Sequence, residues 1–253
     1  MARPEPLISV VTASFNALEG LKTTVASVAG QKFASLEHVI IDGGSRDGTV
    51  EYLASLGTSV SWVSEPDKGI ADALNKGVAK ARGQYIIILQ AEDYFVSEDI
   101  LQSLEEVFDS GPDIVSGGVL VKEAEGGLRL VRSRGLGWRS LIHMTTPHQG
   151  MFCRRDLWRR IGQFDDSYKI AMDYEFVLRA RQSGASWHHL PDAIAVMPDT
   201  GVSSRMDREG LLARLGEFRR AQFAYATAWQ RPLLSLYWTI YPPVKLAKSA
   251  ALR

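Results

Sequence analysis

The sequence predicts an α/β protein with a Rossmann-like, mostly parallel sheet that is covered by helices on both faces. Over residues 7–110, strand-like and helix-like segments alternate four times, which is typical of parallel strands joined by crossover helices. The run Tyr85–Leu89 is continuously apolar and β-branched in its middle, as expected for a strand buried on both faces. With 253 residues and 45% hydrophobic side chains, the chain can bury one substantial core.

Composition narrows the functional classes. The chain has 29 basic and 29 acidic residues, so its overall charge does not suggest nucleic-acid binding. Cys153 is the single cysteine, which excludes an intrachain disulfide and a cysteine-rich zinc site. The sequence shows no signal-peptide pattern, and no apolar run is long enough to span a bilayer. We therefore expect a cytoplasmic protein without a nucleic-acid partner.

The first half of the chain should supply four strand–helix units. Strands are expected at 7–13, 36–42, 59–63 and 84–92, and helices at 18–28, 50–56, 70–81 and 98–108. In the third helix, for example, Ile70, Leu74 and Val78 recur on one face at helical spacing. Asp72 and Lys76, four residues apart on the same helix, are expected to form a solvated ion pair.

The second half departs from this alternation. The runs 113–121 and 127–131, separated by a polar turn, predict a hairpin or edge strands. A short helix is expected after residue 155 and a longer one from residue 170. An amphipathic helix is expected over 206–229, with an apolar face at Leu211, Leu215, Phe218, Tyr225 and Trp229.

Polar side chains follow the predicted parallel strands. Thr12, Asp42 and Glu92 stand at three strand ends, which should converge on one rim, where open parallel sheets bind their ligands. Oxygen side chains there suit a hard divalent cation that carries a diphosphate. If the strand extends to residue 92, Gln90 and Glu92 share one side of it and Asp93 takes the other. The alternative is that Glu92 and Asp93 only open the next loop and cap its helix.

Four motifs in register resemble those of family 2 inverting glycosyltransferases, in order and spacing as well as in residues. They are Val-Val-Thr-Ala-Ser-Phe-Asn at 10–16, Ile-Asp-Gly-Gly-Ser-Arg-Asp-Gly-Thr at 41–49, Pro-Asp-Lys-Gly at 66–69 with Ala-Leu-Asn-Lys-Gly at 73–77, and Gln-Ala-Glu-Asp at 90–93. The resemblance continues through His148-Gln149 and Asp173–Glu175 and covers residues 1–205.

This resemblance implies a GT-A fold, a nucleotide-sugar donor, a divalent metal, either Mn²⁺ or Mg²⁺, and an inverting single displacement. It divides the chain into a GT-A domain at 1–205 and a C-terminal amphipathic helical extension at 206–253. Within the domain, 1–110 would be the nucleotide-sugar-binding half and 111–205 the acceptor-side half. The acceptor would be a glycan or a lipid-linked sugar of a bacterial surface polysaccharide, and the donor a UDP- or GDP-sugar.

The same resemblance implies roles for particular donor-side residues. Thr12 and Phe15 would border the nucleoside, and Asp42 and Asp67 would contact the base or ribose. Gln90 and Glu92 occupy the two positions of the family's Asp-x-Asp metal motif, and Asp93 follows them at the donor. Neither of the two is aspartate, although both offer oxygen ligands. Gly43 stands where many relatives carry an acidic residue.

On the acceptor side, Asp173 matches the position of the family's catalytic base. Inversion needs one carboxylate to take the proton of the acceptor hydroxyl while the metal stabilises the leaving diphosphate. The simpler interpretation of Asp173 is a helix N-cap. His148 could reach the diphosphate or the metal, or could be a structural histidine.

Two other functions fit parts of the pattern. Nucleotidyltransferases also hold a nucleotide over a parallel sheet, but they usually carry a glycine-rich, basic loop that is absent at residues 12–16. A non-catalytic nucleotide-sugar-binding protein would explain the altered metal motif, whereas the presence of Asp173 argues against it.

The C-terminal segment concentrates apolar and aromatic side chains over 229–241, followed by Lys245, Lys248 and Arg253. Aromatic residues beside basic ones suit the headgroup region of a bilayer, and Pro242-Pro243 argues against a span. This pattern predicts peripheral contact of 229–253 with the inner face of the cell membrane. The alternatives are that the segment packs back onto the domain or forms a homodimer contact.

Overall fold

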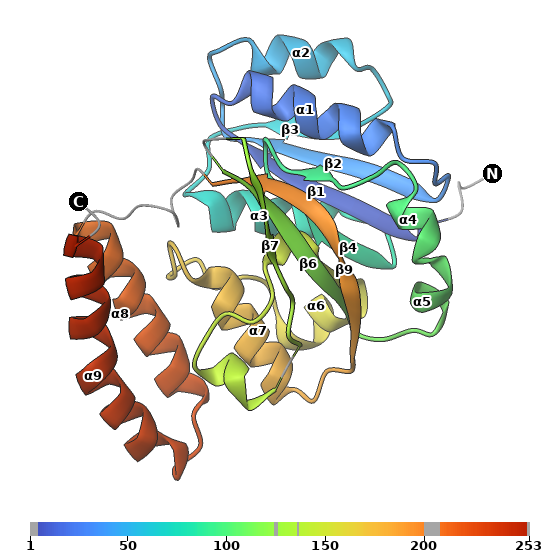
Figure 1. Cartoon of the computed structure of the whole chain (residues 1–253). Helices are drawn as coiled ribbons and strands as arrows, with labels where there is room; N and C mark the ends of the chain where they lie inside the picture. Colours follow the sequence, from blue (N-terminus) through green and yellow to red (C-terminus); the bar gives the residue numbers. More distant parts are fainter. Residues whose placement is uncertain (1–4, 124–125, 136, 200–207, 252–253) are drawn as a thin grey trace.

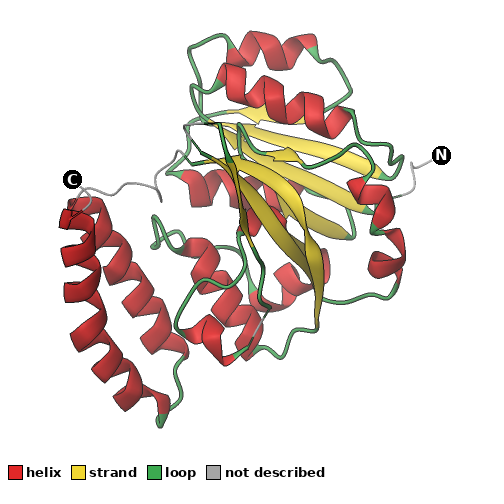
Figure 2. Cartoon of the chain, viewed as in Figure 1, coloured by secondary structure: helices red, strands yellow, loops and turns green. Residues whose placement is uncertain are grey.

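The computed structural model describes residues 5–123, 126–135, 137–199 and 208–251. Figures 1 and 2 show one sheet between two layers of helices, with a pair of long C-terminal helices set to one side. The elements of the first half are β1 (Ile8–Ser14), α1 (Leu18–Ala29), β2 (Leu36–Asp42), α2 (Thr49–Ser55), β3 (Ser61–Ser64), α3 (Ile70–Lys80), β4 (Tyr85–Ile88), β5 (Tyr94–Phe95), α4 (Ile100–Ser103) and α5 (Glu105–Asp109). Those of the second half are β6 (Ile114–Lys122), β7 (Leu128–Val131), the 3₁₀ turns η1 (Trp138–Leu141) and η2 (His148–Gly150), β8 (Met151–Arg154), α6 (Arg155–Ile161), α7 (Met172–Gln182), β9 (Trp187–Pro198), α8 (Arg208–Tyr225) and α9 (Gln230–Ala251).

The sheet has a parallel half and a mixed half. β1 pairs in parallel with β2 and β4, and β3 extends this half beyond β2. β8 then enters antiparallel to both β4 and β6, and β9 pairs in parallel with β6. The hairpin predicted from the two runs after residue 112 is confirmed, since β7 pairs antiparallel with β6.

Alternation along β1 places successive side chains in two different cores. Val10 packs in the cluster that includes α4 and α5, whereas Val11 packs in the cluster that includes α3, α6 and α7. α3 approaches β1 closely, because a Cβ added at Gly77 would come within 2.4 Å of Val11 Cγ1. This contact holds the second half of α3 against the middle of β1.

β4 is shorter than predicted. It ends at Ile88, not at residue 92, and the Asp93 N–H donates to Gln90 O at 3.0 Å to close a turn. Glu92 within this turn has φ of 85°, which no strand residue adopts. The strand does not extend to residue 92, so the condition under which Gln90 and Glu92 would share one side of it is not met.

Three strands, β5, β8 and β9, have no counterpart in the sequence-based prediction, and β5 has only two residues. β8 is only four residues long, and β9 begins with a polar, proline-containing stretch that resembles a loop. The helix predicted over 98–108 is divided at Leu104 into α4 and α5. The Asp72–Lys76 ion pair is confirmed, with a nitrogen–oxygen distance of 3.2 Å.

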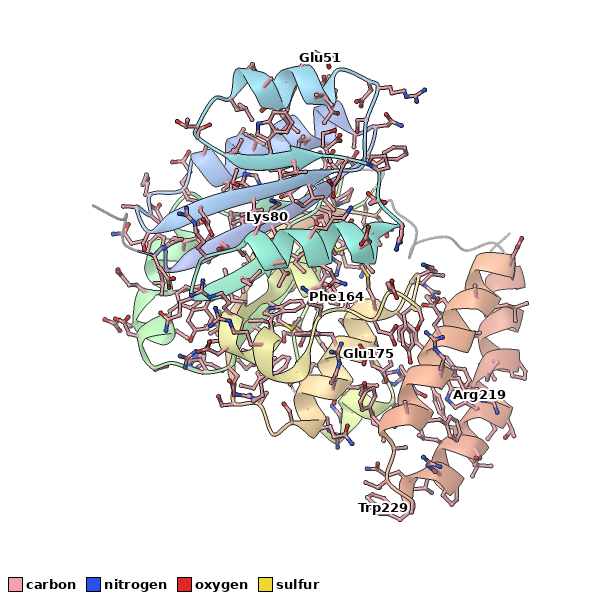
Figure 3. All side chains as sticks on the ribbon, turned by 180° about the vertical axis from the view of Figure 1, so that it is seen from behind. Glu51, Lys80, Phe164, Glu175, Arg219 and Trp229 are labelled. Atoms are coloured by element: carbon pink, nitrogen blue, oxygen red, sulfur yellow. The ribbon has the colours of Figure 1, made fainter. Side chains whose placement is uncertain are left out.

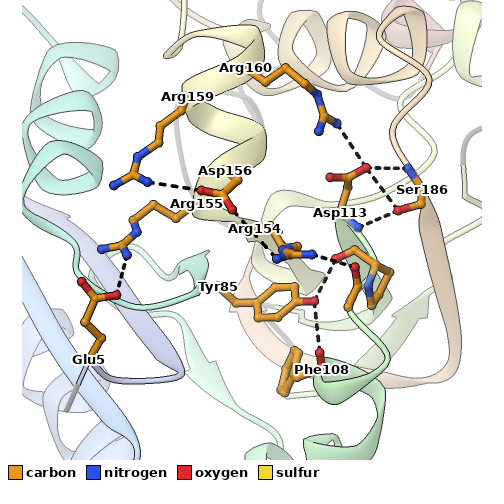
Figure 4. Close-up of polar contacts among 12 residues, drawn as sticks. Glu5, Tyr85, Phe108, Asp113, Arg154, Arg155, Asp156, Arg159, Arg160 and Ser186 are labelled. Atoms are coloured by element: carbon orange, nitrogen blue, oxygen red, sulfur yellow. Dashed lines mark hydrogen bonds and ion pairs between the residues drawn. The ribbon is translucent and has the colours of Figure 1, made fainter.

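A polar network fastens the amino end of β4, remote from the carboxyl-end rim (Figure 4). The Tyr85 hydroxyl donates to Pro112 O at 2.8 Å, and the Arg154 guanidinium donates to Gly111 O at 3.0 Å. Burial raises the pKa of Tyr85 to about 12, so this hydroxyl stays protonated. We assign this network to stability because it lies at the opposite end of the strand from the ligand-binding edge.

α8 and α9 form a helical hairpin beside α7 (Figure 1). Its inward side chains join the core, and the rings of Tyr174 and Phe218 stack at 4.5 Å. One face of the C-terminal segment therefore does pack back onto the domain. The boundary expected at residues 205–206 lies outside the described residues. None of the described helices combines the length and the apolar character that a bilayer span requires.

Candidate active site

A cleft of about 680 Å³ lies at the carboxyl ends of β1 and β4, between the amino ends of α3 and α7. Seven of the nine site residues predicted from the sequence line it: Phe15, Asp67, Gln90, Glu92, Asp93, His148 and Asp173. The structure therefore brings together residues that are up to 158 positions apart (173 − 15) in the chain.

Thr12 and Asp42, the other two, are fully buried beside the cleft and are not among its described lining residues. The Asp42 carboxylate accepts hydrogen bonds from Ser45 N at 2.9 Å and from Ser64 Oγ at 2.6 Å. Thr12 Oγ1 lies 2.9 Å from His38 Nε2, a ring whose pKa burial lowers to about 3. Asp42 thus shapes the turn after β2.

Gly43 makes room for the Asp67 carboxylate. A Cβ at residue 43 would lie 2.6 Å from Asp67 Oδ2 and 3.1 Å from Phe15 Cδ2. The carboxylate of Asp67 thus fills the space that a side chain at 43 would take, and its Oδ1 accepts the Gly69 N–H at 2.8 Å. The glycine at 43 and the carboxylate at 67 are therefore linked, because one leaves the space that the other fills. The sequence alone does not show this link.

The turn after β4 is held against α1. The Thr24 hydroxyl donates to Asp93 O at 2.8 Å and lies 3.0 Å from Gln90 O, and the Glu92 N–H donates to Gly20 O at 3.0 Å. Gly20 has no space for a side chain, because a Cβ there would lie 2.3 Å from Glu92 Cγ. Helix α1 therefore sets the position of the predicted metal motif.

Asp93 is the buried carboxylate of this turn, with 3% of its surface exposed. Its Oδ2 accepts the Gln90 N–H at 2.9 Å. Burial raises the pKa of Asp93 to about 6, against the opposing effect of the His148 charge. Asp93 is thus partly protonated in mildly acidic solution.

His148 connects the two sides of the cleft. Its Nδ1 lies 3.1 Å from Asp173 Oδ2, and its Nε2 lies 3.3 Å from Gln90 Nε2. Burial disfavours the imidazolium, but the hydrogen bond and charge of Asp173 and the charge of Asp93 together raise the pKa of His148 above its ordinary value. In the sequence, the motif His148-Gln149 indicates that His148 is a candidate site residue. It does not indicate which residues His148 contacts.

Asp173 lies in the first turn of α7, where its Oδ1 accepts the Tyr174 N–H at 2.7 Å. The residue that caps the helix is Ala171, so Asp173 is not the N-cap. Its carboxylate borders the cleft and is 23% exposed, which leaves it accessible to a substrate hydroxyl.

The segment just before α7 was missed by sequence reasoning. Residues 168–170 line the cleft, and the Glu217 carboxylate on α8 accepts the backbone N–H groups of Lys169, Ile170 and Ala171, each at 2.8 Å. Lys68 and Lys169 also line the cleft and place two cationic side chains in it. Such charges suit an anionic ligand.

The donor set of the cleft fits a divalent cation that arrives with a diphosphate. The described residues include no group of three His, Cys, Asp or Glu side chains that could form an all-protein metal site. However, Mg²⁺ is usually held by one or two carboxylates together with substrate phosphates and water. Gln90, Glu92 and Asp93 offer oxygen atoms of that kind within one turn of the cleft.

Comparison with known proteins identifies the family of the chain. The model of glycosyl transferase family 2 matches residues 9–172. An uncharacterized glycosyltransferase of Mycobacterium tuberculosis is 38% identical over 183 residues, which cover 69% of each chain. A PGL/p-HBAD biosynthesis glycosyltransferase of Mycobacterium bovis is 28% identical over 187 residues, again 69% of each chain. The chain belongs to glycosyl transferase family 2.

Solved structures support the GT-A fold. A mannosyltransferase of Pyrobaculum calidifontis in complex with GDP-Man and Mn²⁺ has a TM-score of 0.67 at 20% identity, covering 98% of this chain and 74% of that one. S. aureus TarS in complex with UDP-GlcNAc has a TM-score of 0.64 at 18% identity, covering 86% and 71%. The predicted fold class is confirmed, and the protein is a glycosyltransferase.

Proposed function

We propose that this glycosyltransferase moves a sugar, with inversion, from a UDP- or GDP-sugar to a hydroxyl of a glycan or lipid-linked acceptor in bacterial surface polysaccharide synthesis. The observation that supports this most is the position of Asp173. Its carboxylate borders the cleft opposite the turn 90–93 and is hydrogen-bonded to His148. A carboxylate facing the donor site across the cleft is what an inverting transfer requires of its base.

The donor would occupy the side of the cleft formed by β1, β2 and α3. The exposed ring of Phe15 offers a face for stacking a base, and the Asp67 carboxylate beside it offers an acceptor for base or ribose N–H and O–H groups. Thr12 and Asp42 would act by holding the floor and the adjacent turn. Lys68 would add positive charge toward the diphosphate.

The transfer would be a single displacement. The acceptor oxygen forms a bond to the anomeric carbon on one face while the bond to the diphosphate oxygen breaks on the other, and the leaving nucleoside diphosphate takes the electron pair. Asp173 takes the proton of the acceptor hydroxyl. The His148 ring orients the Asp173 carboxylate, and in its charged form it adds a positive charge beside Gln90 and the leaving group.

A divalent metal, Mn²⁺ or Mg²⁺, would be held by Glu92 and Gln90, with Asp93 behind them and His148 at the edge of the set. When bound, such a cation neutralises the charge that develops on the diphosphate. Gln90, Glu92 and Asp93 bring oxygen donors to the cleft from one turn, which is the support for this assignment.

The donor proposal is tested by isothermal titration calorimetry with UDP, GDP and their sugars, with and without Mn²⁺. We expect one nucleotide to bind at least about 10-fold more tightly in Mn²⁺, because the cation neutralises diphosphate charge. A tenfold change in Kd corresponds to about 1.4 kcal/mol. Glu92→Ala should remove most of this Mn²⁺ effect, whereas the exposed Glu51→Ala on α2 should preserve it. Unchanged Mn²⁺ dependence in Glu92→Ala would contradict the metal assignment.

A further inference from the structure

The outer face of α9 carries a row of exposed aliphatic side chains, which we call the α9 stripe. It consists of Leu233, Leu236, Ile240 and Val244, which are 61%, 61%, 58% and 48% exposed. At 3.6 residues per turn, these four positions fall within an arc of about 80°. Trp229, at the tip of the hairpin, is 69% exposed (Figure 3).

The stripe is not needed to hold the hairpin together. The inward face of α9 does that, since Leu234 is 3% exposed and the Trp238 indole donates to Gln222 Oε1 at 2.6 Å. α9 is thus apolar on two opposite faces, and only one of them has a partner among the described residues. An apolar row of this size on an outer helix marks an interaction surface.

A groove of about 240 Å³ adjoins the stripe, between residues 142–144, α8 and α9. His143, Arg214 and Lys245 line it, and no Asp or Glu is among its described lining residues. Tyr237 connects the two features, because it lines the groove and lies one helical turn after Leu233 of the stripe. The stripe therefore borders a groove with basic character.

All charged residues that follow Glu217 in the sequence are basic. Glu217 is the last acidic residue in the sequence, and six basic residues follow it: Arg219, Arg220, Arg231, Lys245, Lys248 and Arg253. If two copies paired through the stripe, two helices that both lack carboxylates would lie against each other. A negatively charged, apolar-cored partner suits this segment better than a second copy.

We propose that the α8–α9 hairpin docks on the surface of an anionic lipid bilayer. The stripe and Trp229 lie at the boundary between headgroups and acyl chains, and the groove faces headgroup phosphates. None of the described helices can span a bilayer, so the contact is peripheral. The proposal does not depend on the donor or acceptor assigned above.

Docking of this kind would attach to the membrane the same hairpin that supports one side of the cleft. Glu217 of the same hairpin holds the backbone of residues 169–171, which precede Asp173. The side of the cleft on which an acceptor hydroxyl would meet Asp173 is therefore the side that the hairpin builds. An acceptor carried by a lipid would reach Asp173 from the surface on which the hairpin lies.

Vesicle flotation of the full chain at low salt tests the proposal, with vesicles of phosphatidylcholine and phosphatidylglycerol and with vesicles of phosphatidylcholine alone. The test variant is Leu236→Gln/Ile240→Gln. The matched control is Leu128→Gln/Leu130→Gln, which changes two exposed leucines of β7. We expect the wild type and the control to float with anionic vesicles, and the stripe variant to lose about 10-fold or more of its partitioning.

The groove is tested by Lys245→Gln, which should reduce binding to anionic vesicles and leave the weaker binding to neutral vesicles unchanged. Lys80→Gln on α3 is its control. Unchanged circular dichroism and donor binding verify that each variant is folded. If Leu236→Gln/Ile240→Gln does not fold, Ile240→Gln alone replaces it in the test. Absence of flotation by the wild type, or equal flotation of the stripe variant, overturns the proposal. A concentration-dependent dimer that the stripe variant abolishes, without flotation, identifies a second copy as the occupant instead.

Discussion

The Glu217 carboxylate accepts the backbone N–H of Ala171 at 2.8 Å, and Ala171 is the residue that caps α7. This contact joins the C-terminal hairpin to the helix that carries Asp173, two residues further on. The same carboxylate also takes the N–H groups of Lys169 and Ile170. In the proposed mechanism, Glu217 would thus be a positioning residue for the acceptor side of the cleft, although it lies outside the segment that resembles the family.

Glu217→Ala should lower turnover by about 10- to 100-fold, because misplacing a catalytic group by about 1 Å has an effect of that size. The KM for the donor should change little, since the donor side of the cleft is untouched. Glu217→Gln keeps one accepting oxygen and should recover part of the turnover. Glu209→Ala, on the exposed face of α8, is the control. Equal loss of kcat and donor affinity in Glu217→Ala would indicate a general structural role.

Gly43→Ala should weaken donor binding. Its Cβ would lie 2.6 Å from Asp67 Oδ2, so the Asp67 carboxylate must move away from residue 43. We expect the donor Kd to rise by about 10-fold, equivalent to the loss of one good hydrogen bond to a charged group. Gly216→Ala on α8, where a Cβ meets nothing within 4 Å, should leave the Kd unchanged and slightly stabilise the helix. Equal donor affinity in both variants would remove Asp67 from the donor site.

Asp93 should make stability depend on pH between about 4 and 6. Its folded pKa of about 6 lies above the ordinary value of 3.8, so the folded state binds the proton more tightly and loses stability as the pH rises through this range. Relative to the wild type, Asp93→Asn should therefore gain up to about 3 kcal/mol between pH 4 and pH 7. Urea unfolding of both proteins at the two pH values measures this difference. The same difference at both values would contradict the assignment.

The pKa of His148 should fall when Asp173 loses its charge. Burial disfavours the imidazolium, and the Asp173 carboxylate is the main group that offsets this effect. NMR titration of the His148 ring should thus give a lower pKa in Asp173→Asn than in the wild type. Asp166→Asn, another acidic residue at the cleft, should change it less. An unaltered His148 pKa in Asp173→Asn would mean that the two residues do not interact in solution.

The sequence predicts the parallel half of the fold because its signals are local. An apolar strand, a turn and an amphipathic helix repeat within about 25 residues, and each motif of the cleft follows directly from one strand. Asp67 follows the third strand directly, but its role and that of Asp173 could be named only through the resemblance to the family. The short turn 90–93 could not be told from a longer strand, because apolar character ends at residue 89 in either case.

Contacts between distant segments are what the sequence does not reveal. His148 meets Asp173 across 25 residues, and Glu217 meets Ala171 across 46. A carboxylate that accepts backbone N–H groups leaves no mark on the residues that donate them, since every non-proline residue carries that donor. Likewise, the sequence shows only that residue 43 lacks a side chain. The structure shows that the Asp67 carboxylate fills the space beside it.

The most direct test of the central claim compares Asp173→Asn with the wild type in two measurements on the same preparation. Asparagine keeps the size and the hydrogen-bonding oxygen of the side chain but cannot take the proton of the acceptor hydroxyl. We predict that turnover falls by about 10²–10⁴-fold, the usual contribution of a general base, while calorimetry gives a donor Kd within about twofold of the wild type, well under the tenfold that corresponds to 1.4 kcal/mol. The control Asp192→Asn should change neither quantity. Near-normal turnover of Asp173→Asn, or loss of donor binding together with turnover, would contradict the assignment of Asp173 as the base.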